Sequence, residues 1–162
     1  MLLVLVPLLL LFWPTVFELT HSFLLDSHIK RPTLSAVLVG CLLFVIFIGS
    51  FFLPDIHIST ETSTFQQHFL GGGVLSFVLY LHVKKTLKLS CAWWQDVALM
   101  YIFVSTLGVS NELLEFFITK SGLGYIDSSD VWWDLAANTA GALSAITLYL
   151  GTKHLIVFLR KK

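Results

Sequence analysis

The sequence predicts an all-α integral membrane protein, a polytopic transmembrane helix bundle of about five spans. The first observation is composition: 56% of the 162 residues are hydrophobic, only 12% are charged, and the mean hydropathy is +0.84. A soluble domain usually has about 25% charged residues, so lipid fits this composition better than water. The second observation is a series of long apolar segments. The third is a one-sided distribution of the basic residues.

The length suits a single helical domain over residues 1–162, with no room for a separate soluble domain. The formal net charge is zero, which predicts no nucleic-acid partner and leaves the lipid bilayer as the main surrounding of the chain. Nothing in the composition fixes the oligomeric state, and a homo-oligomer is compatible with it.

Five segments approach or reach the length of about 20 apolar residues that crosses a bilayer. The first could instead be a secretion signal, which needs a basic start and a small-residue cleavage site. No Lys or Arg precedes Lys30, and the residues at 17–20 make a poor cleavage site. We therefore expect a retained span. The predicted spans are residues 2–17, 34–53, 69–83, 93–118 and 132–159.

The basic residues predict the orientation of the bundle, because loops rich in Lys and Arg stay on the cytoplasmic side. With five spans, only Lys120 falls on the opposite side from the other basic residues. This pattern predicts an N-terminus outside and a C-terminus in the cytoplasm. The residues on the predicted cytoplasmic side are Lys30, Arg31, Lys84, Lys85, Lys88, Lys153, Arg160, Lys161 and Lys162.

Small residues predict where the helices pack closely, since helices in lipid associate through close backbone approach. Ala137, Gly141 and Ala145 are spaced four apart on one face of the fifth span, and three glycines occupy 71–73 in the third. We expect spans three to five to form the tight core, with spans one and two toward lipid. The alternative is that Gly and Ala are simply frequent in membrane helices.

Polar side chains gather at the predicted outer ends of the last three spans. Glu112 and Glu115 are three residues apart on one helix face, and Asp134 and Asn138 are four apart on another. At 1.5 Å per residue, Glu112 lies about 27 Å from the inner anchor Trp94, close to the outer boundary. Carboxylates at such depth normally face the bundle interior. The candidate ligand-binding residues are His68, Glu112, Glu115, Asp130, Asp134 and Asn138.

Each candidate also has a structural interpretation. Asn138 could form an interhelical hydrogen bond, Asp134 could cap a helix, and His68 could be a satisfied interfacial histidine. Glu112 and Glu115 could lie at a solvated helix end. Asp130 is expected in a loop and N-cap, and His82 and the other histidines in loops or at the interface. No cofactor is evident, but a divalent metal could bind, with Glu112, Glu115 and Asp134 as candidate ligands.

Three stretches resemble the VanZ-like family of small bacterial membrane proteins. Residues 134–142 are close to the family pattern Asp-x-x-x-Asn-x-x-Gly-Ala, residues 111–116 are similar to its Glu-Leu-Leu-Gln, and residues 68–71 to its His-Phe. The chain has Glu115 where the family usually has Gln. The resemblance covers roughly residues 66–150 and implies an integral protein of the bacterial plasma membrane and cell envelope, with no biochemical mechanism to carry over.

Three functions fit these residues. The first and favoured one is a non-enzymatic envelope protein that binds a lipid or envelope-linked ligand through the outer polar cluster. The second is a metal-dependent membrane enzyme acting on a lipid-linked substrate, although the chain has no HExxH, GxSxG or phosphate-loop motif. The third is a small ion-coupled transporter subunit, which would have to oligomerise.

Overall fold

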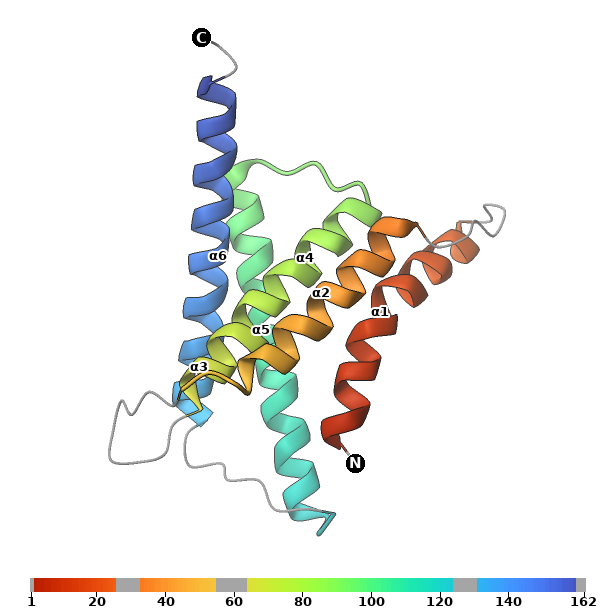
Figure 1. The fold of residues 1–162 in the computed structure, drawn as a ribbon, viewed down its shortest axis with the longest axis vertical. Helices are drawn as coiled ribbons and strands as arrows, with labels where there is room; N and C mark the ends of the chain where they lie inside the picture. Colours follow the sequence, from red (N-terminus) through yellow and green to blue (C-terminus); the bar gives the residue numbers. More distant parts are fainter. Residues whose placement is uncertain (1, 26–32, 55–63, 124–130, 160–162) are drawn as a thin grey trace.

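Successive long helices run in alternating directions, so that their ends collect at two opposite ends of the molecule (Figure 1). The computed structural model describes residues 2–25, 33–54, 64–123 and 131–159, and within these ranges the fold is all-α with no strand. The helices are α1 (Leu2–Leu24), α2 (Leu34–Ser50), α3 (Phe65–Gln67), η1 (His68–Val74), α4 (Leu75–Thr86), α5 (Trp93–Lys120) and α6 (Val131–Leu159).

These helices correspond to the predicted apolar segments, with shifted ends. α1 continues beyond residue 17 to Leu24, and α2 ends at Ser50 rather than at residue 53. Among the described residues, two helices are long and apolar enough to cross a membrane, over Val6–Leu24 and Trp93–Lys120, while α2 is apolar but shorter. Large apolar side chains such as Phe12, Leu38 and Ile102 are exposed on these helices, which fits a lipid environment.

The third helical rod combines α3, η1 and α4 without a break. Its middle part, η1, is a π-helix, which has a wider turn than an α-helix and often occurs at functional sites. α6 packs directly on η1: a Cβ built on Gly141 would lie 2.1 Å from the Phe69 carbonyl oxygen. On the same face of α6, Ala137 is fully buried and Ala145 is half-buried beside the core.

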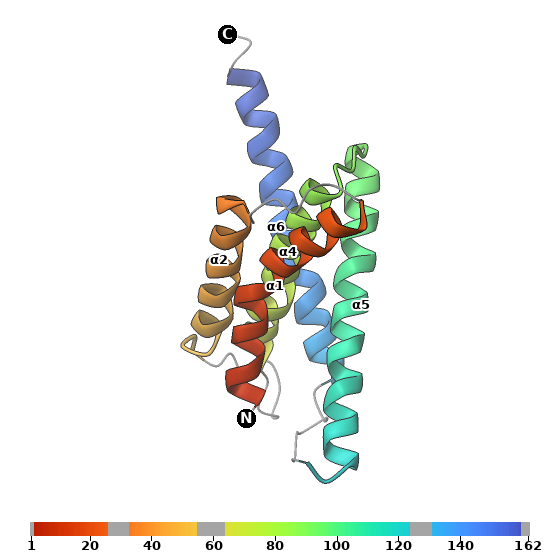
Figure 2. The ribbon, with the colours of Figure 1, turned by 90° about the vertical axis from the view of Figure 1, so that its right-hand side faces the viewer.

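Two apolar cores hold the helices together. One lies between α4, α5 and α6 and is built around Phe77, Met100 and Ile146. The other joins α2 to the third rod through Leu43, Leu75 and Leu79. Helices α1 and α2 pack mainly against each other and form a separate layer against α4 (Figure 2). Close packing extends beyond the last three rods, where it was expected. A Cβ built on Gly40 of α2 would lie 2.1 Å from the Leu11 carbonyl oxygen of α1, so α1 and α2 approach each other as closely as α6 approaches η1.

Helix α1 bends partway along its length, as both views show (Figures 1 and 2). Pro7 and Pro14 lie inside it, and a proline within a helix removes one hydrogen bond and bends the axis. His82 of α4 is within hydrogen-bond distance of this helix, with Nε2 3.3 Å from the Pro14 carbonyl oxygen. The interpretation of His82 as a loop or interface residue is wrong, because it is buried between α4 and α1.

Candidate functional site

The candidate site lies at the end of the bundle where the third rod begins, α5 approaches its end and α6 begins (Figure 1). His68 is the first residue of η1, and Asp134 lies in the first turn of α6. Glu112 comes from α5, which runs antiparallel to both. The alternating helix directions therefore bring together three side chains that are far apart in the sequence.

These three side chains form one compact polar cluster (His68, Glu112 and Asp134), here called the outer cluster after the side of the membrane that the sequence predicts for it. Each offers one potential ligand atom, and these atoms all lie within 4.8 Å of one another. His68 Nε2 is 3.3 Å from Asp134 Oδ2, and the other carboxylate oxygen of Asp134 accepts a hydrogen bond of 3.1 Å from Thr64 Oγ1. A His/Glu/Asp group of this geometry could hold a metal ion.

The burial of the cluster makes its charge costly. Asp134 is only 4% exposed, and His68 and Glu112 are half-buried. A buried carboxylate needs charged or hydrogen-bonding partners to offset the lost hydration. The first turn of α6 supplies part of this, because the positive end of a helix dipole stabilises an anion. His68 and Thr64 supply further partners for the Asp134 carboxylate.

Asn138 forms the floor of the outer cluster, one helical turn deeper in the bundle. Its side chain lies between two glycines: a Cβ on Gly72 would stand 1.6 Å from Asn138 Oδ1, and one on Gly108 would stand 3.2 Å from Asn138 Nδ2. Gly72 follows His68 by four residues and Gly108 precedes Glu112 by four, so these residues form the next layer below. Only glycine leaves room for the Asn138 amide at position 72, while a Cβ at position 108 would make a tight contact with it.

The structure separates the remaining candidates from this cluster. Glu115 accepts a hydrogen bond of 2.8 Å from Asn111 Nδ2 on its own helix and is not part of the three-residue group. Of the carboxylates considered as metal ligands, Glu115 therefore lies outside the group, while His68, a candidate ligand-binding residue from the sequence, lies within it. Asp130 lies outside the described residues. Ala137 and Gly141 lie in the packing surface between α6 and η1.

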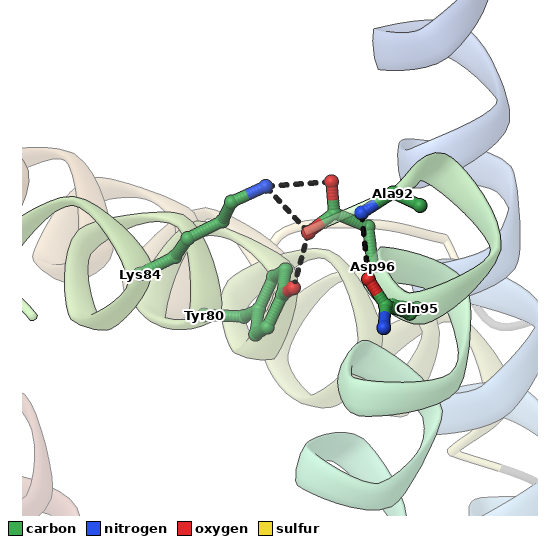
Figure 3. A network of polar contacts seen from close by, with 5 residues as sticks. All are labelled: Tyr80, Lys84, Ala92, Gln95 and Asp96. Atoms are coloured by element: carbon green, nitrogen blue, oxygen red, sulfur yellow. Dashed lines mark hydrogen bonds and ion pairs between the residues drawn. The ribbon is translucent and has the colours of Figure 1, made fainter. Parts of the chain in front are cut away.

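A second buried acid, at the opposite end of the bundle, was missed by sequence reasoning. Asp96 of α5 is 5% exposed and receives hydrogen bonds from Lys84 Nζ at 2.5 and 2.6 Å and from Tyr80 Oη at 2.7 Å. Figure 3 shows Tyr80 and Lys84 of α4 directed toward Asp96. We call these three residues the inner clasp, after the side of the membrane that the sequence predicts for this end of the bundle. They join α4 to α5 beside the short connection between the two helices.

One sequence signal could have revealed the inner clasp. Antiparallel helices joined by a short connection place the end of the first beside the start of the second. Lys84 lies in the last turn of α4 and Asp96 in the first turn of α5, so opposite charges face each other across the turn. Lys84 was considered only as a loop lysine that indicates the orientation of the bundle. Its pairing with Asp96 was therefore not recognised.

No protein-family model, curated protein or solved structure matches this chain. The resemblance to the VanZ-like family therefore remains an expectation from the sequence. The function has to be argued from the geometry of the outer cluster itself.

Proposed function

We propose that this chain is a polytopic integral membrane protein of the VanZ-like kind that binds a lipid or envelope-linked ligand at the outer cluster. The observation that carries the proposal is the convergence of His68, Glu112 and Asp134, from three different helical rods, within 4.8 Å. In our proposal the chain has five spans, with its C-terminus in the cytoplasm, and resides in a bacterial plasma membrane.

Helix length and direction support the five-span arrangement. The shortest rod, α2, has 17 residues, which is the lower limit of the range of about 17–25 residues that cross the hydrocarbon core. The rods alternate in direction (Figure 1). With that alternation, Lys84 and Lys85 at the end of α4 fall at the same end of the bundle as Lys153 near the end of α6. Loops enriched in basic residues favour this end as cytoplasmic.

A binding role accounts for polar groups at this depth better than helix packing does. The glycines around Asn138 and the backbone contact between Gly141 and η1 already hold the third rod against α6. Adding two carboxylates and an imidazole beside that contact costs hydration free energy, and an interhelical packing role requires none of the three. Ionisable side chains in a membrane helix bundle commonly mark a ligand or ion pathway.

The imidazole of His68 favours a second candidate, a metal-dependent enzyme acting on a lipid-linked substrate. A bound cation next to two carboxylates could polarise a phosphoryl or carbonyl oxygen of such a substrate. The two functions share the same site and differ in whether the ligand is chemically changed.

The test is ligand retention by the protein purified in mild detergent and measured by native mass spectrometry. Wild type should retain a membrane-derived ligand as a discrete mass above the bare chain. Glu112→Gln should lose that mass, because its carboxylate belongs to the cluster. Glu115→Gln is the matched control: it makes the same chemical change one turn along α5, outside the cluster, and should retain the ligand.

Two outcomes would contradict the proposal. One is a wild-type protein that carries no ligand from its native membrane extract. The other is equal loss of ligand in both variants, which would assign the effect to the general polarity of the helix end. Incubating the ligand-loaded protein and searching for a changed mass separates binding from turnover.

A further inference from the structure

We infer that the outer cluster binds one divalent transition-metal ion, Zn²⁺ or Mn²⁺, and that this ion contacts an anionic oxygen group of the ligand. The inference rests on the proposed function, because it names what the cluster presents to that ligand. Phosphate is the commonest anionic group of lipid-linked molecules and is the chemistry that such an ion would recognise.

The geometry of the cluster suits an ion between its side chains. Metal bonds to imidazole nitrogen and carboxylate oxygen are about 2.0–2.2 Å long. Two such ligands at an angle between tetrahedral and right-angled are therefore roughly 3.0–3.5 Å apart. His68 Nε2 and Asp134 Oδ2 are 3.3 Å apart, inside that interval. The Glu112 ligand atom is within 4.8 Å of the other two, so a small movement of this side chain on metal binding would complete the set.

Asn138 provides an independent indication of a ligand. It is 4% exposed, and among the described residues its Oδ1 atom has no hydrogen-bond partner. Buried polar atoms are nearly always hydrogen-bonded to protein or ordered water, so a buried amide oxygen in this state needs a partner. An amide oxygen is an acceptor for a cation or for water bound to one. This oxygen lies against Gly72, four residues beyond His68, and Asn138 itself follows Asp134 by one turn of α6, so the unpartnered oxygen belongs to the layer next to the cluster.

The charge of this end of the bundle explains why an ion is needed. The cluster contains two carboxylates, which repel a phosphate group. Among the described residues, Lys120 is the only Lys or Arg at this end, and its Nζ lies over the Phe116 ring, 5.7 Å from the ring centre. A divalent ion reverses the local electrostatics and makes an acidic site attractive to an anion.

The donor set selects the kind of ion. Mg²⁺ and Ca²⁺ prefer oxygen ligands alone, and Mg²⁺ usually keeps most of its water. An imidazole combined with carboxylates favours first-row transition metals, with Zn²⁺ and Mn²⁺ suited to a mixed nitrogen and oxygen set. Three protein ligands leave coordination positions for water or for a ligand oxygen.

The test is metal binding by the purified full-length protein after treatment with a chelator and detergent exchange. We would titrate Zn²⁺, Mn²⁺, Mg²⁺ and Ca²⁺ separately, and measure bound metal by elemental analysis and affinity by calorimetry. Wild type should bind one Zn²⁺ or Mn²⁺ per chain, with much weaker binding of Mg²⁺ and Ca²⁺. Loss of an outer-sphere partner alone typically weakens metal binding 10- to 100-fold. Removing a direct ligand in Glu112→Gln or Asp134→Asn should therefore weaken it by about 100-fold or more.

Control variants separate a specific site from general acidity or misfolding. Glu115→Gln should bind metal like wild type. Glu112→His replaces one ligand by another and should retain Zn²⁺ binding even where Glu112→Gln loses it. The inference is overturned if wild type binds no ion at one per chain, if all four ions bind equally, or if Glu112→Gln and Glu115→Gln bind alike. The first two of these outcomes are measured on wild type alone, so they hold even if a variant folds poorly.

Ligand retention distinguishes this inference from the proposed function. If chelated wild type keeps its membrane-derived ligand while Glu112→Gln loses it, the cluster binds the ligand directly and the metal inference is wrong. If chelation releases the ligand and Zn²⁺ or Mn²⁺ restores its binding, both are supported. If the metal binds as described but no ligand is retained, the metal site stands and the proposed function fails.

Discussion

The two ends of the helix bundle each bury an aspartate near the start of a helix, and they treat it differently. At the inner clasp, Asp96 is matched by the Lys84 ammonium and the Tyr80 hydroxyl, so that charge is balanced within three residues. At the outer cluster, Asp134 shares its site with a second carboxylate, Glu112, and with one imidazole. The same fold thus has one acid committed to joining two helices and another in a site with a surplus of negative charge.

Under the proposed function, Asp96 serves stability and Asp134 serves binding. A charge-balanced, hydrogen-bonded group contributes most when its partners stay in place. A group of like charges destabilises the empty fold and gains its favourable interactions on binding a cation, which is the usual compromise between stability and function. Substitutions at the two ends should therefore change the free energy of unfolding by different amounts and in opposite directions.

Removing the charge of Asp96 should have the largest effect. Asp96→Asn leaves the Lys84 ammonium without its carboxylate in a mostly buried position, and breaking a buried pair in this way costs about 3–5 kcal/mol. The measurement is the free energy of unfolding in detergent, with unfolding monitored by circular dichroism. The double variant Lys84→Met/Asp96→Leu, which removes both charges, should recover most of the loss. A loss in Asp96→Asn below about 1 kcal/mol would show that the clasp is not structural.

Filling the space beside Asn138 should have the next largest effect. Gly72→Ala places a Cβ where the Asn138 amide lies, and such overpacking costs about 1–3 kcal/mol. The Asn138 side chain must also turn away from position 72, so the affinity for the metal ion should fall together with the free energy of unfolding. Gly49→Ala is the matched control, since nothing lies within 4 Å of its added Cβ. That change should be neutral or stabilising by up to about 1 kcal/mol. Equal unfolding free energies and equal metal affinities in the two variants would contradict the close packing of Asn138 against Gly72.

A smaller effect is expected from the second partner of Asp96. Tyr80→Phe removes one hydroxyl that donates to Asp96 at 2.7 Å and leaves the ion pair with Lys84 intact. A hydrogen bond to a charged group contributes about 1.5–3 kcal/mol, and we expect a loss near the lower value. Unfolding free energies of the single and double variants with Asp96→Asn would measure the coupling. Additive losses would show that the two residues do not act together.

The smallest effect, with the opposite sign, is expected at the outer cluster. In chelated protein, Glu112→Gln removes one of two crowded carboxylates, so the unfolding free energy should stay constant or rise by up to about 1 kcal/mol. With Zn²⁺ or Mn²⁺ present, wild type should gain stability by mass action while the variant does not. A large loss of stability in the chelated variant would instead make Glu112 a structural residue.

Helix positions and the outer cluster could be predicted because both follow from local spacing. Apolar runs indicated the helices, and i+3 and i+4 spacing placed Glu112, Asp134 and Asn138 on inward faces. Glu115 separated from the cluster because the three ligand atoms come from one layer of the bundle, and a residue three positions along α5 bonds within its own helix. Spacing alone does not show which of two neighbouring acids reaches the adjacent helices.

The features that the sequence did not predict depend on contacts between helices. The π-helical turn of η1, the burial of His82 against α1 and the pairing of Lys84 with Asp96 all involve a second element. The extension of α1 to Leu24 has the same origin. Its last turns are less apolar than its first, and Glu18 accepts hydrogen bonds from Thr33, the N-cap of α2. Hydropathy alone does not reveal a hydrogen-bonding partner such as Thr33 on another segment of the chain.

The most direct test compares the two buried aspartates through one matched substitution. We would purify Asp134→Asn and Asp96→Asn alongside wild type and measure the retained membrane-derived ligand by native mass spectrometry, with the unfolding free energy of each sample. Asp134→Asn should lose the ligand and keep the stability of chelated wild type, while Asp96→Asn should lose stability and keep the ligand. Loss of stability in Asp134→Asn together with full ligand retention would contradict the assignment of the outer cluster as a binding site.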